Sequence, residues 1–273
     1  MNAELRLHFL DGVLAVEAPA AYLAQVETRF NKALTEEPAD RRLVVEQVPW
    51  PLAGVTDENP VVDYTPHGGR LTSSWYRLEQ YNGDCRVLLR NLNVIGLGRV
   101  LMQWAAMLLL PPGGALFHAA GFVTPSGRGC LATGRSEAGK TTLARSLLES
   151  GWSVLSDEAP ALLFDVEGPR VLYTPFCGDL GIVSPRQKAA PLSALMLLEK
   201  GPSIELDPLE PPELLRGLLR TVVSYGNARR FSSRIIDTLR DIAVTVPGYR
   251  ISLPRELDAV ELEARLAADD PST

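Results

Sequence analysis

Residues 134–141 read Gly134-Arg135-Ser136-Glu137-Ala138-Gly139-Lys140-Thr141 and match the pattern G-x-x-x-x-G-K-[ST] without a gap. The two glycines allow the backbone to curl so that successive N–H groups point toward phosphate oxygens. Lys140 is a point charge on a flexible stem that can reach the β- and γ-phosphates, and the Thr141 hydroxyl can ligate Mg²⁺. We refer to residues 134–141 as the phosphate loop and predict that it binds a nucleoside triphosphate with Mg²⁺.

The segments on both sides of the phosphate loop have the character that such a loop requires. Residues 130–133 are apolar and strand-like, and residues 141–150 are predicted to form a helix with Leu143 and Leu147 on one face. Gly151 then provides a typical C-terminal stop. The alternative is a chance glycine-rich turn before an ordinary helix, and the strand–loop–helix order disfavours it.

Two carboxylates follow the next apolar strand, where Val154-Leu155-Ser156 leads into Asp157 and Glu158. In a phosphoryl-transfer site one acid at this place would hold Mg²⁺, directly or through water, and the other could accept the proton of an attacking hydroxyl. A solvated acidic turn is the alternative, which the neighbouring phosphate loop disfavours. His118 stands alone in an apolar strand, a pattern more typical of a structural core histidine.

Lysine is scarce in this chain. Of its 27 basic residues 23 are arginine, and the lysines are Lys32, Lys140, Lys188 and Lys200. A coding bias toward arginine explains most of this skew, but a phosphate loop needs a compact charge, so we expect Lys140 to be functional. The net charge of −6 argues against a general attraction to nucleic acid or to anionic membranes.

Cysteine usage and hydropathy favour a cytoplasmic location. The three cysteines form no CxxC motif and have no paired histidine, which is typical of a reducing compartment and argues against a zinc site. The first residues lack the basic and apolar regions of a signal peptide. The most apolar run, residues 100–110, has about half the length that a bilayer requires.

We predict two domains that meet at the breaker cluster Pro111-Pro112-Gly113-Gly114. Residues 1–110 are expected to form a small accessory α+β domain with a hairpin turn at Asp11-Gly12 and an irregular stretch at 46–69. Its expected strands are 5–9, 13–16 and two within 70–89, and its expected helices are 20–34 and 97–110. Residues 111–273 are expected to form an α/β domain around a central sheet. Its predicted strands are 116–124, 130–133, 152–155, 161–166, 171–173, 194–198 and 249–253, and its further helices are 213–223, 233–243 and 258–267.

Several of these segments together resemble the HPr kinase family, and more closely the stand-alone HPr-kinase-related bacterial kinases. The similar segments are Phe117-His118-Ala119-Ala120-Gly121, the glycine turn that follows, the phosphate loop, Gly151-Trp152, Ser156-Asp157-Glu158 and Pro191 to Glu199. The resemblance covers residues 115–200. It implies a P-loop kinase domain with the fold of the HPr kinase C-terminal domain and of PEP carboxykinase. It further implies an ATP- and Mg²⁺-dependent kinase of serine hydroxyls in a protein or peptide, and it suggests homo-oligomers.

The resemblance also implies roles for individual residues. Asp157 would be the base toward the acceptor hydroxyl, His118 would orient Asp157, and Lys140 would serve the phosphates. Thr141 and Glu158 would hold the metal. The nucleotide contacts would come from Gly134, Arg135, Ser136, Glu137, Ala138, Gly139, Lys140, Thr141 and Thr142, with Arg186 as a phosphate contact.

The sequence departs from that family at three places. Glu137-Ala138 stands where HPr kinases usually show Gly-x, and the second acid is Glu158 rather than aspartate. Residues 176–181 lack the arginine of the I-R-G-x-G signature. These departures argue against HPr as the substrate and against the reverse phosphorylase reaction. Two alternatives to a protein kinase stay open, namely a kinase of a small hydroxylated metabolite and a non-catalytic ATP-binding regulatory module.

Overall fold

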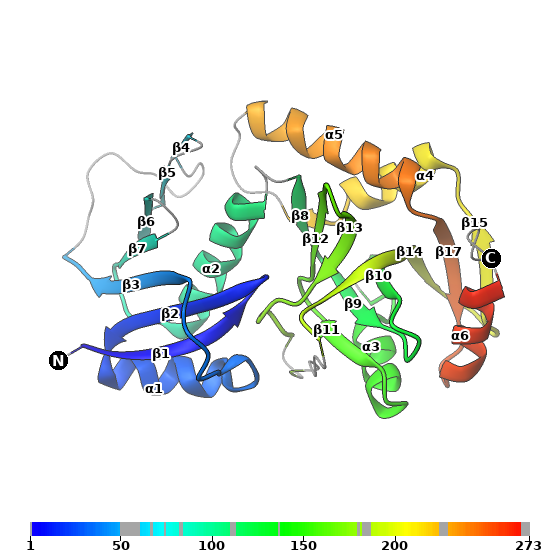
Figure 1. Cartoon of the computed structure of the whole chain (residues 1–273), viewed down its shortest axis with the longest axis horizontal. Coiled ribbons are helices and arrows are strands. Elements are labelled where there is room, and N and C mark those ends of the chain that lie inside the picture. Colours follow the sequence, from blue (N-terminus) through cyan, green and yellow to red (C-terminus); the bar gives the residue numbers. More distant parts are fainter. Residues whose placement is uncertain are drawn as a thin grey trace. The chain divides into compact units, whose positions relative to one another are not determined.

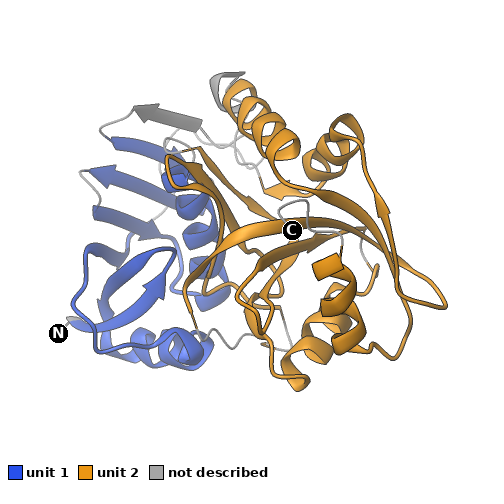
Figure 2. Cartoon of the chain, turned by 45° about the vertical axis from the view of Figure 1, so that its right-hand side comes forward, with its two compact units in different colours: residues 1–111, 224–232 blue, residues 112–223, 233–273 orange. Residues whose placement is uncertain are grey.

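The computed structural model describes residues 2–49, 61–65, 68–73, 75–81, 84–109, 113–135, 137–178, 181, 187–223 and 229–268. The chain is a mixed α/β protein that divides into two compact units, 1–111 with 224–232 and 112–223 with 233–273 (Figure 2). The first division point lies beside the predicted boundary at 110/111. Residues 224–232, which the sequence prediction placed in the second domain, are grouped with the first unit.

The first unit is built on a seven-stranded sheet. Its elements are β1 Asn2–Phe9, β2 Gly12–Pro19, α1 Ala20–Arg29, the 3-10 helix η1 Asn31–Ala33, β3 Arg41–Gln47, β4 Val61–Thr65, β5 Gly68–Thr72, β6 Tyr76–Tyr81, β7 Asp84–Leu89 and α2 Val94–Leu109. The strand order is β1-β2-β3-β7-β6-β5-β4. The fully buried ring of Trp104 on α2 stacks on Phe9 with centroids 5.4 Å apart, so this apolar helix helps to form the core of the unit.

The prediction of an irregular stretch at residues 46–69 is wrong for its second half, because residues 61–65 lie in β4 and residues 68–69 lie in β5. The prolines that suggested a loop flank β4 in the sequence, at positions 60 and 66, and do not interrupt it. β4 is also the edge strand of its sheet, where proline near a strand is tolerated.

The second unit carries a ten-stranded sheet and the phosphate loop (Figure 1). Its elements are β8 Gly114–Phe117, β9 Ala119–Val123, β10 Gly129–Thr133, α3 Lys140–Glu149, β11 Ser153–Ser156, β12 Ala161–Asp165, β13 Gly168–Leu172, β14 Ala189–Lys200, β15 Glu205–Pro208, α4 Pro211–Leu219, β16 Val222–Val223, α5 Arg229–Thr245, β17 Gly248–Leu253 and α6 Ala259–Ala268. The principal strand order is β11-β9-β10-β14-β13-β12-β8-β16, and β17 pairs with β14 and β15.

Strands β10, β11, β14 and β17 of this sheet run in the same direction. β10 is parallel to β14, and β14 is parallel to β17. β11 and β10 are both antiparallel to β9 and therefore parallel to each other. The carboxyl ends of β10, β11, β14 and β17 consequently lie along one edge of the sheet, which is the edge where ligands bind in α/β proteins.

Helices cover both faces of these strands. Leu143 and Leu147 of α3 share a buried cluster with Leu262 of α6 and with Met196 of β14, which places α3 and α6 on one face. On the other face, Gly217 of α4 lies so close to Leu197 that an added Cβ would be 2.5 Å from its Cδ2. Because neighbouring residues of a strand point to opposite faces, α4 covers the face away from α3 (Figure 1).

The strand predicted at residues 116–124 is two strands, since the chain breaks pairing at His118. β8 pairs with β12 and β16, whereas β9 pairs with β10 and β11. The helix predicted at 213–223 ends at Leu219, and residues 222–223 form β16 instead. In the described parts of the chain, no helix combines the length and the apolar character needed to cross a bilayer.

Candidate functional site

The phosphate loop connects β10 to α3, as the sequence predicts. Gly139 precedes the first turn of α3 with φ 105°, a left-handed conformation that favours glycine. Gly134 is required for a different reason, because an added Cβ would lie 2.9 Å from the carbonyl oxygen of Leu198. Glu137 also has a positive φ, 65°, which strains a residue with a side chain. The described residues of the loop thus have backbone conformations that suit a curled, phosphate-binding loop.

Lys140 is buried inside the phosphate loop, with 8% of its surface exposed. Its Nζ donates hydrogen bonds to the carbonyl oxygens of Gly134 at 3.1 Å and Arg135 at 3.2 Å. Burial lowers the pKa of Lys140 from its ordinary value of 10.5, and the Glu158 carboxylate opposes this effect. A buried ammonium held by neutral carbonyl groups is a site for an anion, since a phosphate oxygen would bind it more strongly.

The two predicted acids follow β11, at the same edge of the sheet as the phosphate loop. The hydroxyl of Ser156 donates a hydrogen bond to the Phe176 carbonyl at 2.5 Å and accepts one from the N–H of Ala159 at 2.9 Å. These bonds hold the turn that carries the acids. Asp157 is only 2% exposed, and its Oδ1 accepts a hydrogen bond from the Gly178 N–H at 3.0 Å.

Gly178 is a site residue that the sequence prediction missed. An added Cβ would lie 3.3 Å from Oδ2 of Asp157 and 3.7 Å from Oε2 of Glu158, so the backbone passes close to both carboxylates. Its segment, residues 176–181, was singled out only because it lacks a signature arginine. The glycine itself carried a signal, since a glycine near acids often marks a close backbone approach.

His118 occupies the break between β8 and β9, where its backbone is held on both sides. Its N–H donates a hydrogen bond to the Thr221 carbonyl at 2.7 Å, and its carbonyl accepts one from the Thr133 hydroxyl at 3.1 Å. Its imidazole Nδ1 lies 3.5 Å from Oε1 of Glu158. The side chain is 49% exposed, so the interpretation as a core histidine is wrong. The family resemblance implied that His118 orients Asp157, but the structure pairs it with Glu158.

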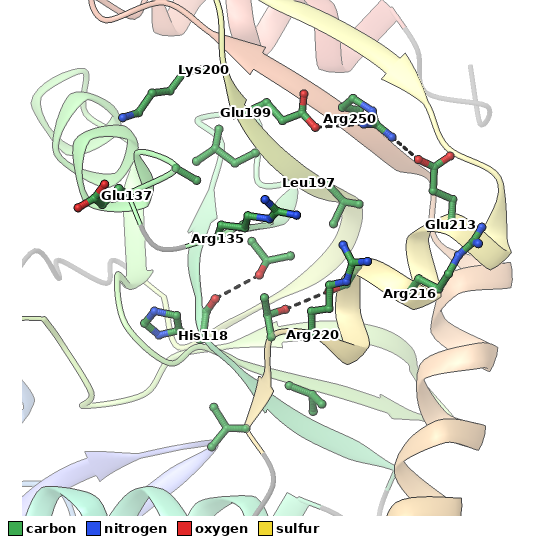
Figure 3. Close-up of a pocket in the computed structure, with 18 residues that line it drawn as sticks. His118, Arg135, Glu137, Leu197, Glu199, Lys200, Glu213, Arg216, Arg220 and Arg250 are labelled. Carbon is green, nitrogen blue, oxygen red and sulfur yellow. Dashed lines mark hydrogen bonds and ion pairs between the residues drawn. The ribbon is translucent and has the colours of Figure 1, made fainter.

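Among pockets lined by described residues, two adjoin the phosphate loop, on opposite faces of β14. The larger, of about 1130 Å³, extends from His118 and the loop to α4 and β16 (Figure 3). It is lined by His118, Thr133, Gly134, Arg135, Glu137, Ala138, Leu197, Leu198, Glu199, Lys200, Glu213, Arg216, Gly217, Arg220, Thr221, Val222, Val223 and Arg250. The smaller, of about 410 Å³, lies between the first turns of α3 and the ends of β14 and β17. Its lining includes Thr142, Leu143, Ser146, Leu198, Leu253 and Leu257.

The structure brings together most of the residues predicted for the site. Lys140 and the two acids lie at one edge of the sheet, and Thr141 and Thr142 begin α3. The predicted contacts Ser136 and Arg186 lie outside the described residues. The sequence prediction missed Arg216 and Arg220 of the larger pocket. Their i,i+4 spacing in a predicted helix was a readable signal, because it places both on one helix face.

Comparison with known proteins yields little. No protein-family model and no curated protein sequence matches this chain. Among solved structures, the chain is similar to the HPr(Ser) kinase/phosphatase from Coxiella burnetii, with 12% sequence identity and a TM-score of 0.30. That similarity covers 56% of this chain and 94% of the other. It is too low to carry an argument about fold or function, so the functional conclusion rests on the site itself.

Proposed function

We propose that this protein is an ATP- and Mg²⁺-dependent kinase that transfers the γ-phosphoryl group to a serine hydroxyl of a protein or peptide. One observation carries the proposal: Lys140 is buried in the loop that follows β10, at the sheet edge where Asp157 and Glu158 follow β11. Two separate sequence motifs, each suited to phosphoryl transfer, therefore meet in one site. The serine specificity comes from the family resemblance and is part of the proposal.

The phosphates would lie in the phosphate loop, where backbone N–H groups and Lys140 surround them. A hydroxyl from Thr141 and a carboxylate from Glu158 are the hard oxygen donors that Mg²⁺ prefers, so these two residues would hold the ion. Bound Mg²⁺ would neutralise charge on the phosphates. His118 would in turn position Glu158, since its Nδ1 lies 3.5 Å from Oε1 of that carboxylate.

Asp157 would accept the proton of the acceptor hydroxyl. Its carboxylate is fixed through Oδ1 by the Gly178 N–H, which limits its rotation. A fixed carboxylate favours transfer because most of the catalysis in such sites comes from positioning and charge stabilisation. Gly178 matters here because a Cβ at that position would lie 3.3 Å from Oδ2 of Asp157 and press on that carboxylate.

The smaller pocket is suited to the nucleoside part of ATP. It lies beside the first turns of α3, on the side of β10 away from β11 and its acids. Four leucines, Leu143, Leu198, Leu253 and Leu257, provide apolar surface for a base. The volume of about 410 Å³ is in the range of small-molecule sites. A nucleoside bound there would direct its phosphates along the loop toward Asp157.

The test is a transfer assay with γ-labelled ATP and a pool of serine-containing peptides, run beside a metabolite extract. We expect label in peptides, and we expect Asp157→Asn to reduce transfer by roughly 10²–10⁴-fold while ATP still binds. Asp207→Asn, an exposed aspartate on β15, is the matched control. Label confined to small molecules would favour a metabolite kinase. ATP binding without transfer to either pool would favour a regulatory module.

A further inference from the structure

We propose that the larger pocket binds the acceptor through carboxylate groups that lie near its hydroxyl, and that Arg216 and Arg220 hold them with Arg135 opposite. This inference rests on the proposed function and names the class of acceptor. The acceptor would be an acidic one, with its anionic groups either on flanking side chains or at a chain terminus.

The position of the larger pocket suits an acceptor. One end is formed by His118 and by the phosphate loop, so a ligand there would approach the γ-phosphate. The other end is formed by α4 and β16, on the face of β14 opposite the smaller pocket. Since the smaller pocket is suited to the nucleoside, the larger one remains for a second ligand.

The larger pocket is cationic although the chain as a whole is acidic. Five basic side chains line it, against the three carboxylates Glu137, Glu199 and Glu213. Two of those carboxylates are already used, because Arg250 binds Glu199 at 3.0 Å and also binds Glu213. The basic side chains are Arg135, Lys200, Arg216, Arg220 and Arg250.

Three guanidinium groups are left to act on a ligand. Among the described residues, the side chains of Arg135, Arg216 and Arg220 make no ion pair, and Arg216 donates only to the Pro212 carbonyl, at 3.1 Å. Figure 3 shows Arg135 and Arg220 directed into the space between the loop and α4. Like charges facing one space repel each other unless an anion lies between them. The pocket is therefore prepared for negative charge.

Carboxylates are the anions that fit this arrangement. The guanidinium group is a planar fork that binds a carboxylate with two parallel hydrogen bonds. Arg216 of α4 and Arg220, the residue that caps this helix, lie one turn apart, so each can hold one carboxylate of the acceptor. The phosphates of ATP would bind in the loop under the proposed function, which leaves Arg216 and Arg220 to the acceptor.

The test uses fluorescent serine peptides of equal length, in which the serine is flanked by glutamate, alanine or lysine. Each peptide is made with a free and with an amidated C-terminus, which separates acidic side chains from a terminal carboxylate as the source of charge. Binding is measured by fluorescence polarisation in the presence of a non-hydrolysable ATP analogue and Mg²⁺. We expect the acidic peptides to bind roughly tenfold tighter than the amidated alanine peptide.

Two kinds of variant test which residues are responsible. Arg216→Ala and Arg220→Ala should each weaken binding of the acidic peptides roughly fivefold to tenfold and leave the amidated alanine peptide unchanged. Arg220→Glu should reverse the preference toward the lysine peptide, which loss of folding would not do. Arg145→Glu, an exposed position of α3 outside both pockets, is the control and should keep the wild-type preference.

Equal binding of all peptides by the wild-type protein, or an acidic preference that survives Arg216→Ala and Arg220→Ala, would overturn the inference. Absence of peptide binding would overturn it as well. Failure of the proposed function looks different, because the ATP analogue would then not bind or no peptide would be phosphorylated, while the acidic preference in the binding assay could persist.

Discussion

The imidazole Nδ1 of His118 lies 3.5 Å from Oε1 of Glu158, which joins the break between β8 and β9 to the turn after β11. The two neighbouring acids therefore have different surroundings. Asp157 is buried and held by a backbone N–H, whereas Glu158 is partly exposed and faces an imidazole. Two carboxylates in different environments are suited to different tasks, one as base and one as metal ligand.

His118→Ala should act through Glu158. We expect a rise in the Mg²⁺ concentration needed for half-maximal transfer, with little change in binding of metal-free ATP. In a double-mutant cycle with Glu158→Gln the two effects should be strongly non-additive, because each variant removes the same interaction. Additive losses, or a Mg²⁺ dependence like that of the wild type, would contradict a positioning role for His118.

Lys140→Met should abolish the stabilisation by ATP seen as a rise in Tm, because the phosphates lose their buried cation. The variant should also change how the free energy of unfolding depends on pH. Burial lowers the pKa of Lys140 in the folded state, so between that value and 10.5 the unfolded chain binds more protons. The wild-type protein should therefore gain stability relative to Lys140→Met as pH rises through this window, as urea unfolding at several pH values can measure.

A stability difference between these two proteins that stays constant from neutral pH to pH 10 would contradict a lowered pKa of Lys140. Arg145→Met provides the control, since its exposed guanidinium should leave both the pH profile and the ATP effect unchanged.

Glu137→Gly should stabilise the protein, because glycine adopts the positive φ of this position without strain. The left-handed conformation costs a residue with a Cβ about 1–2 kcal/mol, and the greater freedom of glycine in the unfolded chain cancels part of the gain. We expect about 0.5–1 kcal/mol in the free energy of unfolding. Glu137→Ala keeps the backbone strain and removes the charge, so it should not show this gain in stability. If both variants are stabilised equally, removal of the carboxylate charge and not relief of strain explains the gain.

Ser146→Trp should place an indole ring in the smaller pocket, since Ser146 lines it from α3. We expect ATP affinity to fall at least about tenfold while the affinity for inorganic tripolyphosphate stays the same, because the phosphate loop is untouched. Calorimetric titration measures both ligands, and Arg145→Trp is the control on an exposed face of the same helix. An equal loss of affinity for ATP and for tripolyphosphate would show that the adenine base does not bind in the smaller pocket.

Sequence patterns predicted the helices and turns whose formation depends on residues that are close together in the chain. The helix after the phosphate loop follows from an apolar face of period 3.6, and α3 confirms it. Gly139 has the left-handed backbone expected of the loop's second glycine, whereas nucleotide binding by the loop stays a prediction. The hairpin at Asp11 and the helix before the domain boundary were predicted from turn chemistry and hydropathy for the same reason. Such features need only residues that are close in the sequence.

The sequence by itself predicted the phosphate loop, the helix after it and the two acids that follow the next strand. Only the tertiary structure decided that His118 faces Glu158, that Gly178 approaches both acids, and that Arg135 and α4 border one pocket. These relationships arise from pairing among β9, β10, β11 and β14, which joins segments far apart in the chain. Periodicity within one segment carries no information about its partner, so packing alone established the site's geometry.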